Sequence, residues 1–414
     1  MTRTLTADTL RRLYPRVLAK TLGFTRSLPD AEDAVQDAIE RALTTWPEKG
    51  APDSAEAWLL TVAANAHRDR LRRGRREELR VDALEALAQM SPWARMALGE
   101  AEVARGWKDE LLRLLFACCH PALEAGESAA LALSTVIGLS VRETAAAFLT
   151  PPRSMEQRLT RARQRLRERG DYEGARPAEA RDRLEPVLRA VHLLFNEGYW
   201  SGSDTAPIRS ELCRLALGIA KSLAEAFPSE PEVAGLVALI SLHEARRRAR
   251  LDDTGVPVPL PDQDRTRWDH HAIVQATALL ERALAGQKPG PFQIEAAISA
   301  VHCRAGTAGE TDWQEIAALY ALLESFRPIA AVRVNRAFAV ARANDAAAGL
   351  ALLDDNSTID ANDYAYVHLV RGSLLEELGR TEEARDALQR ALAHAHNEAE
   401  RIQITARLRS LGGA

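Results

Sequence analysis

Charged side chains form one acidic and two strongly basic segments in the first 170 residues. The segment from Leu28 to Glu40 holds five carboxylates and no basic residue. A helix N-terminus favours acids in its first turn, which accounts for Asp33 and for Asp30, the residue that we expect to cap the helix. Asp37 and Glu40 lie beyond that turn. The sequence therefore predicts that this acidic face meets solvent or a positively charged partner.

The first basic segment runs from Trp58 to Arg76 and carries six arginines after position 67, with Asp69 as its acid. Its apolar positions follow helical spacing, so the arginines are expected on the surface, where they could follow a nucleic-acid strand. The preceding loop, Trp46 to Ser54, is expected to be capped by Asp53 and could let an aromatic ring stack on an unpaired base. Burial of Trp58 in the core is the competing interpretation.

The second basic segment follows a predicted helix-turn-helix. An apolar helix over Ser128 to Ile137 should end at Gly138, and the serine and glutamate of Ser140-Val-Arg-Glu143 form a capping box for a short helix through Phe148. A second box, Ser154-Met-Glu-Gln157, is expected to cap the last helix, which runs to about Arg169.

That last helix has the properties of a recognition helix. It holds seven arginines between Arg153 and Arg169, with Met155, Leu159, Ala162 and Leu166 as a predicted buried stripe. A short helix, a tight turn and a basic second helix are the geometry that enters the major groove. We expect base contacts from Ser154, Gln157 and Arg158, and phosphate contacts from Arg161 and Arg165.

Composition predicts an all-α protein of several compact units. The chain has 414 residues, of which 5% are aromatic, and is rich in alanine, leucine, arginine and glutamate. Residues 1–170 hold 27 basic and 23 acidic side chains, a charge of +4, whereas the remainder holds 27 and 35, a charge of −8. The four cysteines form no CxxC pair, and no apolar run is long enough to cross a bilayer. We expect a soluble, cytoplasmic protein with reduced thiols and no membrane contact.

Breakers divide the chain into two small helical domains, 1–76 and 106–170, a linker at 77–105, and a helical extension at 182–414. A weak repeat ends the extension: an offset of 35 residues superposes Ala337 on Gly372, Gly349 on Ala384 and Leu353 on Leu388. This offset is close to the tetratricopeptide period. A generic alanine- and leucine-rich hairpin is the alternative.

Taken in order, these segments resemble the extracytoplasmic-function sigma factors of bacterial RNA polymerase. The string Asp30-Ala-Glu-Asp-Ala-Val-Gln-Asp37 is similar to the part of region 2 that docks on the β′ clamp coiled coil. The string Ala57-Trp-Leu-Leu-Thr-Val-Ala-Ala-Asn65, with Asp69-Arg-Leu-Arg-Arg73, resembles the helix that reads the −10 element, where Asn65 would face a flipped base. The resemblance implies polymerase contacts at Asp33, Gln36, Asp37 and Glu40, and DNA contacts at Trp58, Asn65, Arg68, Arg72 and Arg73.

The helix-turn-helix is similar to region 4, which binds the −35 element and the β flap. Two positions depart from the family pattern: Ala64 stands where many members have arginine, and Glu156 stands where a basic or small residue is common. The base preference at both promoter elements is therefore open.

The extension resembles that of a subgroup with a tetratricopeptide-like C-terminal region. The strings that carry this resemblance are Phe195-Asn-Glu-Gly-Tyr199, His243-Glu-Ala-Arg246, and the segment from Asp262 to Asp269. In that subgroup the extension is thought to replace a separate membrane anti-sigma protein. The resemblance thus implies regulation of the factor through the extension, by a protein or a small molecule.

Two other classes of function compete with a sigma factor. A metal-dependent enzyme could use Asp262, Asp264, Asp269, His270 and His271, although their spacing matches no zinc motif and helix capping explains the aspartates. Adjacent Cys118 and Cys119 point about 100° apart on a helix, which favours a buried structural role. A helical interaction scaffold with an attached DNA-binding module would leave the acidic helix unexplained. We therefore expect no catalytic residue, metal or cofactor.

Overall fold

The computed structural model describes residues 7–52, 54–77, 110–148, 150–168, 180–199, 208–252, 258–355, 365–395 and 398–412. Its regular elements in these ranges are α-helices and short 3-10 helices, as the composition predicts. The chain forms two compact units, Met1–Leu194 and Phe195–Ala414. Nearly all of the predicted linker lies outside the described residues. The division falls inside a helix rather than at the predicted start of the extension, residue 182.

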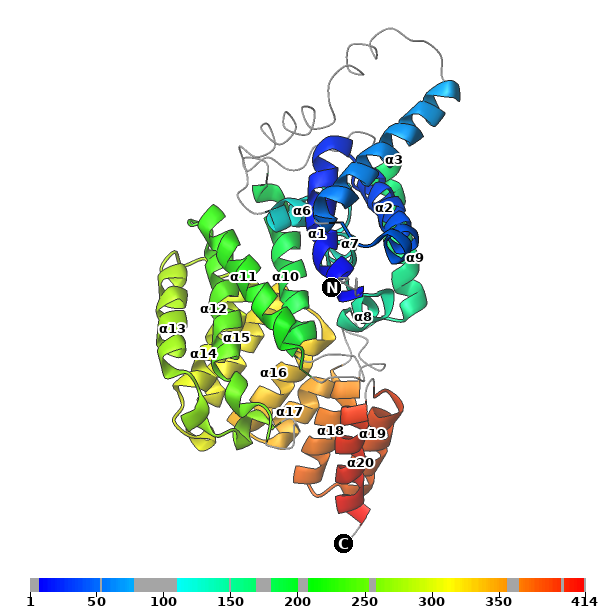
Figure 1. Ribbon diagram of the computed structural model, residues 1–414. Helices are drawn as coiled ribbons and strands as arrows, with labels where there is room; N and C mark the ends of the chain where they lie inside the picture. The colour runs from blue at the N-terminus through cyan, green and yellow to red at the C-terminus, as the bar shows by residue number, and fades with distance from the viewer. Residues whose placement is uncertain are drawn as a thin grey trace. The chain divides into compact units, whose positions relative to one another are not determined.

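Three helices open the first unit: α1 (Ala7–Thr25), α2 (Leu28–Lys49) and α3 (Ala55–Glu77), which pack on one another (Figure 1). Ser27, not Asp30, caps α2, because the Ser27 hydroxyl accepts the amide hydrogen of Asp30 at 3.4 Å. The helix continues through Pro47 and ends at Lys49, and the following cap, Gly50, has a φ of 80°, which suits glycine. The expected cap Asp53 lies outside the described residues.

The helix-turn-helix is confirmed in outline. It consists of α7 (Ala125–Thr135), α8 (Val141–Ala147) and α9 (Pro152–Glu168), preceded by α6 (Glu110–Cys118). The Ser140 box is present, with the Glu143 amide donating to the Ser140 hydroxyl at 3.2 Å and the Ser140 amide to the Glu143 carboxylate at 2.8 Å. Ser154 does not cap α9, since the helix already begins at Pro152. The predicted stripe of Met155, Leu159, Ala162 and Leu166 is buried.

A short 3-10 helix, η1 (Arg181–Arg183), leads into α10 (Leu184–Tyr199), in which the two units divide. Arg183 is buried and donates to the backbone oxygen of Phe116 in α6 at 3.4 Å. The η1 helix that leads into α10 therefore belongs to the first unit.

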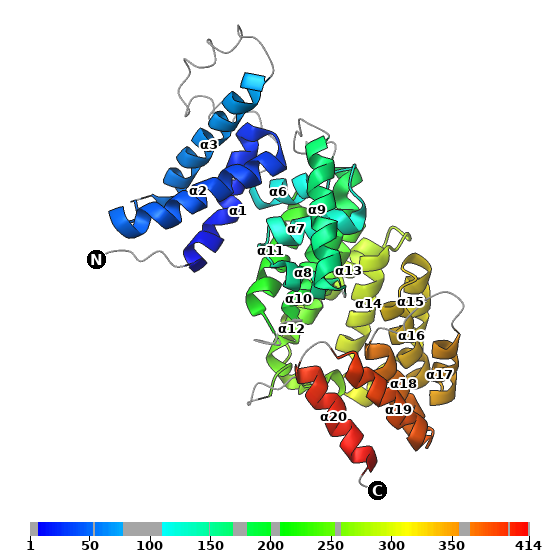
Figure 2. The same cartoon turned by 90° about the vertical axis from the view of Figure 1, so that its right-hand side faces the viewer.

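The second unit is a succession of helices in which each packs on its neighbours in the chain (Figure 2). Its helix α12 has apolar residues on every side, and it is enclosed by α11, α13 and α14. The elements are α11 (Ser210–Ala226), α12 (Pro231–Ala245), η2 (Arg247–Ala249), η3 (Leu260–Asp262), η4 (Arg265–Arg267), α13 (His270–Leu284), α14 (Pro291–Arg304), η5 (Ala308–Glu310), α15 (Trp313–Phe326), α16 (Ala330–Ala343), α17 (Ala346–Asp354), α18 (Ala365–Glu377), α19 (Thr381–Ala393) and α20 (Glu398–Gly412).

Two helical pairs near the end of the chain occupy the positions of the predicted repeat. In α16 and α17, a Cβ at Gly349 would lie 2.7 Å from the backbone oxygen of Ala337. In α18 and α19, a Cβ at Gly372 would lie 2.9 Å from the Leu388 side chain. Each pair thus uses a glycine to bring its helices close together. None of the described helices combines the length and the apolar character that crossing a membrane requires.

Candidate polymerase and nucleic-acid interfaces

The predicted docking residues lie along one side of α2, at helical spacings of three and four. Gln36 and Glu40 are exposed, and the Gln36 amide donates to the Glu40 carboxylate at 3.3 Å. Asp37 accepts from Arg70 of α3 at 2.7 Å, and a second Arg70 nitrogen lies 3.7 Å from the Asp33 carboxylate. The acidic face is therefore partly neutralised by the basic helix beside it.

Glu32, on the same helix, makes the most enclosed polar contact between α2 and the helix-turn-helix. Its carboxylate accepts two hydrogen bonds from Arg163 of α9, at 3.0 and 3.2 Å, and one from the Thr135 hydroxyl of α7, at 2.7 Å. The Glu32 side chain is 13% exposed. We call Glu32, Arg163 and Thr135 the Glu32 latch.

The electrostatics of the latch follow from this enclosure. Burial alone would lower the pKa of Arg163, but the charge and hydrogen bonds of Glu32 outweigh it and raise that pKa. Burial and the Glu32 charge together raise the pKa of the Tyr14 hydroxyl. Glu32 thus stabilises the charged form of Arg163.

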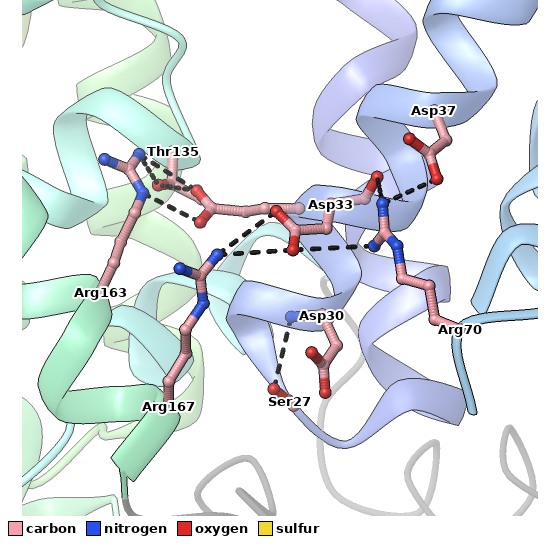
Figure 3. A network of polar contacts seen from close by, with 9 residues as sticks. Ser27, Asp30, Asp33, Asp37, Arg70, Thr135, Arg163 and Arg167 are labelled. Carbon is pink, nitrogen blue, oxygen red and sulfur yellow. Dashed lines mark hydrogen bonds and ion pairs between the residues drawn. The ribbon is translucent and has the colours of Figure 1, made fainter. Parts of the chain in front are cut away.

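A second, looser pair lies one turn along α9. Arg167 is 3.4 Å from the Asp33 carboxylate, and both side chains are about half exposed, at 53% and 46%. Figure 3 shows Asp33 between Arg167 and Arg70, with Arg163 reaching toward Thr135. The recognition helix therefore covers part of the acidic face of α2.

Glu32 and its partners are absent from the residues that the sequence singles out. Both Glu32 and Arg163 stand in charged runs, but they are 131 positions apart, and no spacing rule pairs them. The helical phase of the buried α9 stripe could have indicated that Arg163 and Arg167 lie on the side of α9 opposite Arg158 and Arg161.

The residues predicted to meet the −10 strand share α3. Trp58 is half-buried and packs edge-on against Trp46 with ring centroids 5.1 Å apart, so it contributes to the core between α2 and α3. Asn65 is exposed, and its amide oxygen accepts from Arg68 one turn away. The side chains of Arg72 and Arg73 lie outside the described residues.

The predicted base-reading residues occupy the first two turns of α9. Ser154 and Gln157 are exposed, and the Arg158 guanidinium lies 5.4 Å from the centroid of the Phe148 ring. Arg161 is exposed and donates to the Gln157 carbonyl of its own helix at 3.3 Å. Arg165, expected at a phosphate, instead pairs with buried Glu127 of α7 at 2.5 Å.

Comparison with known proteins identifies the two parts of the chain that hold these helices. Residues 9–77 match the family described as Sigma-70 region 2, and residues 113–166 match Sigma-70, region 4. The chain therefore carries the region 2 and region 4 domains of a sigma-70 factor. A family of unknown function, DUF6596, matches residues 183–284 of this sigma factor. An uncharacterized protein of Rhizobium meliloti (strain 1021) is 40% identical over 395 residues, covering 95% of the sigma factor and 93% of the relative. No solved structure matches this sigma factor significantly.

Capping accounts for two of the aspartates that could have held a metal in this sigma factor. The Asp264 carboxylate accepts from the Thr266 amide at 3.0 Å, and the Asp269 carboxylate accepts from the Ala272 amide at 3.0 Å. Cys118 and Cys119 are buried, and burial raises the pKa of both thiols. Within the described ranges, no group of three or more histidine, cysteine or acidic side chains is placed to bind a metal.

Proposed function

We propose that this sigma factor docks on core RNA polymerase through the side of α2 that carries Asp33, Gln36, Asp37 and Glu40. The observation that carries the proposal is the alignment of these four side chains on one partly exposed helix face within the matched region 2. The β′ clamp coiled coil is the partner that the family resemblance implies, and region 4 would meet the β flap.

Docking has to exchange ion pairs that the chain already makes. Asp33 and Asp37 are held by Arg70, and Arg167 covers Asp33 from the other side. Exposed pairs of this kind contribute about 0–1 kcal/mol each, so basic groups on polymerase can replace them at small cost. The Glu32 latch, which keeps α9 beside Asp33, is the stronger obstacle to this exchange.

A pair of double variants tests the docking face. Reversing the charges in Asp33→Arg/Asp37→Arg should abolish binding to core polymerase in a pull-down. Arg70→Gln/Arg167→Gln breaks the same internal ion pairs but keeps both acids, so it should bind at least as well as the unmodified chain. Circular dichroism controls for folding. Normal binding by the folded charge-reversal variant would refute the docking face.

Promoter reading is proposed to use two helices. The exposed side of α9, with Ser154, Gln157, Arg158 and Arg161, would enter the major groove of the −35 element. Arg165 would contact a phosphate while it keeps its ion pair with Glu127. In α3, Asn65 would meet a flipped −10 base after exchanging its bond with Arg68. Trp58, Arg68, Arg72 and Arg73 complete the proposed −10 surface.

The C-terminal extension is proposed to regulate this activity through tetratricopeptide-like pairs of helices. Equivalent positions come close in the two pairs: a Cβ at Gly349 would lie against the Ala337 oxygen, and one at Gly372 against the Ala384 oxygen. Because Ala337 aligns with Gly372 and Gly349 with Ala384, these two approaches support the repeat. The test is a chain that ends after residue 199, because Arg183 is bonded to the first unit and should be retained. Transcription profiles should change in strength but not in promoter choice. An altered promoter set would contradict this division of roles.

A further inference from the structure

A group of cationic side chains surrounds Trp268 in the second unit, outside both sigma regions. The Arg246 guanidinium lies 6.0 Å from the centroid of the Trp268 ring, and that of Arg265 lies 4.6 Å from it. Arg246 is 3% exposed and Trp268 is 4% exposed. His302 of α14 accepts from Arg265 through its backbone oxygen, and the charges of both arginines act on its imidazole. We call Arg246, Arg265, Trp268 and His302 the Trp268 cluster.

The two arginines of the cluster lack the carboxylate partners that Arg327 and Arg336 of this unit have. Arg246 contacts His243 Nδ1 at 2.9 Å, and Arg265 donates to the backbone oxygens of His302 and Ala305, both at 2.7 Å. No ion pair involves Arg246 or Arg265 in the described part of the chain. By contrast, Arg327 pairs with Glu295 at 2.6 Å, and Arg336 pairs with Glu324 at 2.6 Å.

Two hydrogen-bond donors in the cluster are buried without an acceptor among the described residues: Arg246 Nε and the indole nitrogen of Trp268. An unpaired buried donor is costly, and an uncompensated buried charge is costlier. The carboxylate whose charge acts on Arg265, that of Glu310, already bonds the Thr307 amide within its own turn. The fold therefore holds positive charge and unused N–H groups side by side.

The charges of the two arginines also act on His302. Burial, followed by the charges of Arg246 and Arg265, lowers the pKa of His302 to about 4. Its imidazole is therefore neutral at pH 7. Arg265 and His302 are only half-buried, so part of the cluster reaches the surface.

We propose that the Trp268 cluster binds the oxyanion group of a small molecule, a carboxylate or a phosphate. Arg246 Nε and the Trp268 indole N–H are the donors, and Arg265 adds charge beside the same ring. Oxyanions are the groups that a guanidinium recognises best. The proposal gives the extension a ligand class, but it does not depend on the regulatory role, because binding is measured without transcription.

The test uses the full chain with inorganic phosphate and, separately, succinate, at constant ionic strength, followed by calorimetric titration and thermal unfolding. Saturable binding that stabilises the protein is expected for at least one of them. Binding of phosphate alone or succinate alone would identify which oxyanion the cluster prefers. Absence of saturable binding of both would overturn the proposal.

Matched variants locate the site. Trp268→Phe keeps an aromatic ring but removes the N–H, and should weaken binding roughly tenfold, as loss of one hydrogen bond to a charged group does. Arg246→Met should abolish binding, whereas Arg248→Met removes the same charge from an exposed position two residues away and should leave binding unchanged. If Arg246→Met does not fold, Trp268→Phe decides alone. Equal affinity in Trp268→Phe and Arg248→Met would refute the site.

Discussion

The Glu32 latch should be the dominant contact between the acidic helix and the recognition helix, and Arg163→Met tests this. The substitution keeps the aliphatic stem of the side chain but removes both hydrogen bonds to the Glu32 carboxylate. Deleting one partner of a fully buried pair costs about 3–5 kcal/mol. Because Glu32 is 13% and Arg163 31% exposed, water screens the pair in part. We expect a loss of about 2 kcal/mol in the free energy that holds α9 against α2.

Arg167→Met is the matched control, since it removes the same group one turn along the same helix. Its partner Asp33 is 46% exposed, so the loss should stay below about 1 kcal/mol. Hydrogen exchange in the full chain, read on peptides from α2 and α9, measures the two losses separately from unfolding of the second unit. Equal effects of the two substitutions, or no increase in exchange for Arg163→Met, would refute the reasoning.

A double variant separates pairing from packing. Glu32→Met/Arg163→Met leaves no isolated buried charge, so its cost should be smaller than the two single costs added together. We expect a coupling of about 1–2 kcal/mol. Strict additivity would mean that the two side chains act independently.

Three further measurements follow from the structure. Folding lowers the pKa of His302 from 6.5 to about 4, so between these pH values the unfolded chain binds more protons than the folded one. The second unit should therefore lose up to about 3 kcal/mol of stability as the pH falls from 6.5 to 4. In pH-dependent unfolding, His302→Gln should reduce this loss. Gly349→Ala should destabilise the protein by about 1–3 kcal/mol through contact with the neighbouring helix, whereas Gly218→Ala, in open space, should be neutral or stabilising in the same denaturation assay. Arg158→Ala should cost about 1–3 kcal/mol at one base of the −35 element in binding titrations, and an equal loss on every DNA sequence would assign it to a phosphate.

Local signals in the sequence were sufficient for most of the helices. The capping box at Ser140 and the buried stripe of α9 are set by neighbouring residues, and both were predicted correctly. The errors also have local causes. In the sequence Asp30 is a plausible cap, but the Ser27 hydroxyl bonds the Asp30 amide and caps α2 instead. Ser154 does not cap α9 because Pro152 begins it, where the N–H that proline lacks is not needed.

Contacts between distant segments were not predictable in the same way. The sequence shows that Arg163 and Arg165 are charged and Glu32 and Glu127 acidic, but only the packing of α2, α7 and α9 determines which pairs form. The same holds for Arg246, whose burial without a carboxylate depends on how α12 meets the segment that holds Trp268.

Glu32 and Asp33 are neighbours in the chain but lie about 100° apart around α2. One contributes to the latch, and the other belongs to the surface proposed for polymerase. Adjacent codons should therefore give opposite phenotypes in a genetic screen: loss of the carboxylate at 33 weakens recruitment of polymerase, while its loss at 32 releases the recognition helix and favours recruitment. A mutagenesis study that scored this acidic run as a single motif would average the two effects and miss both.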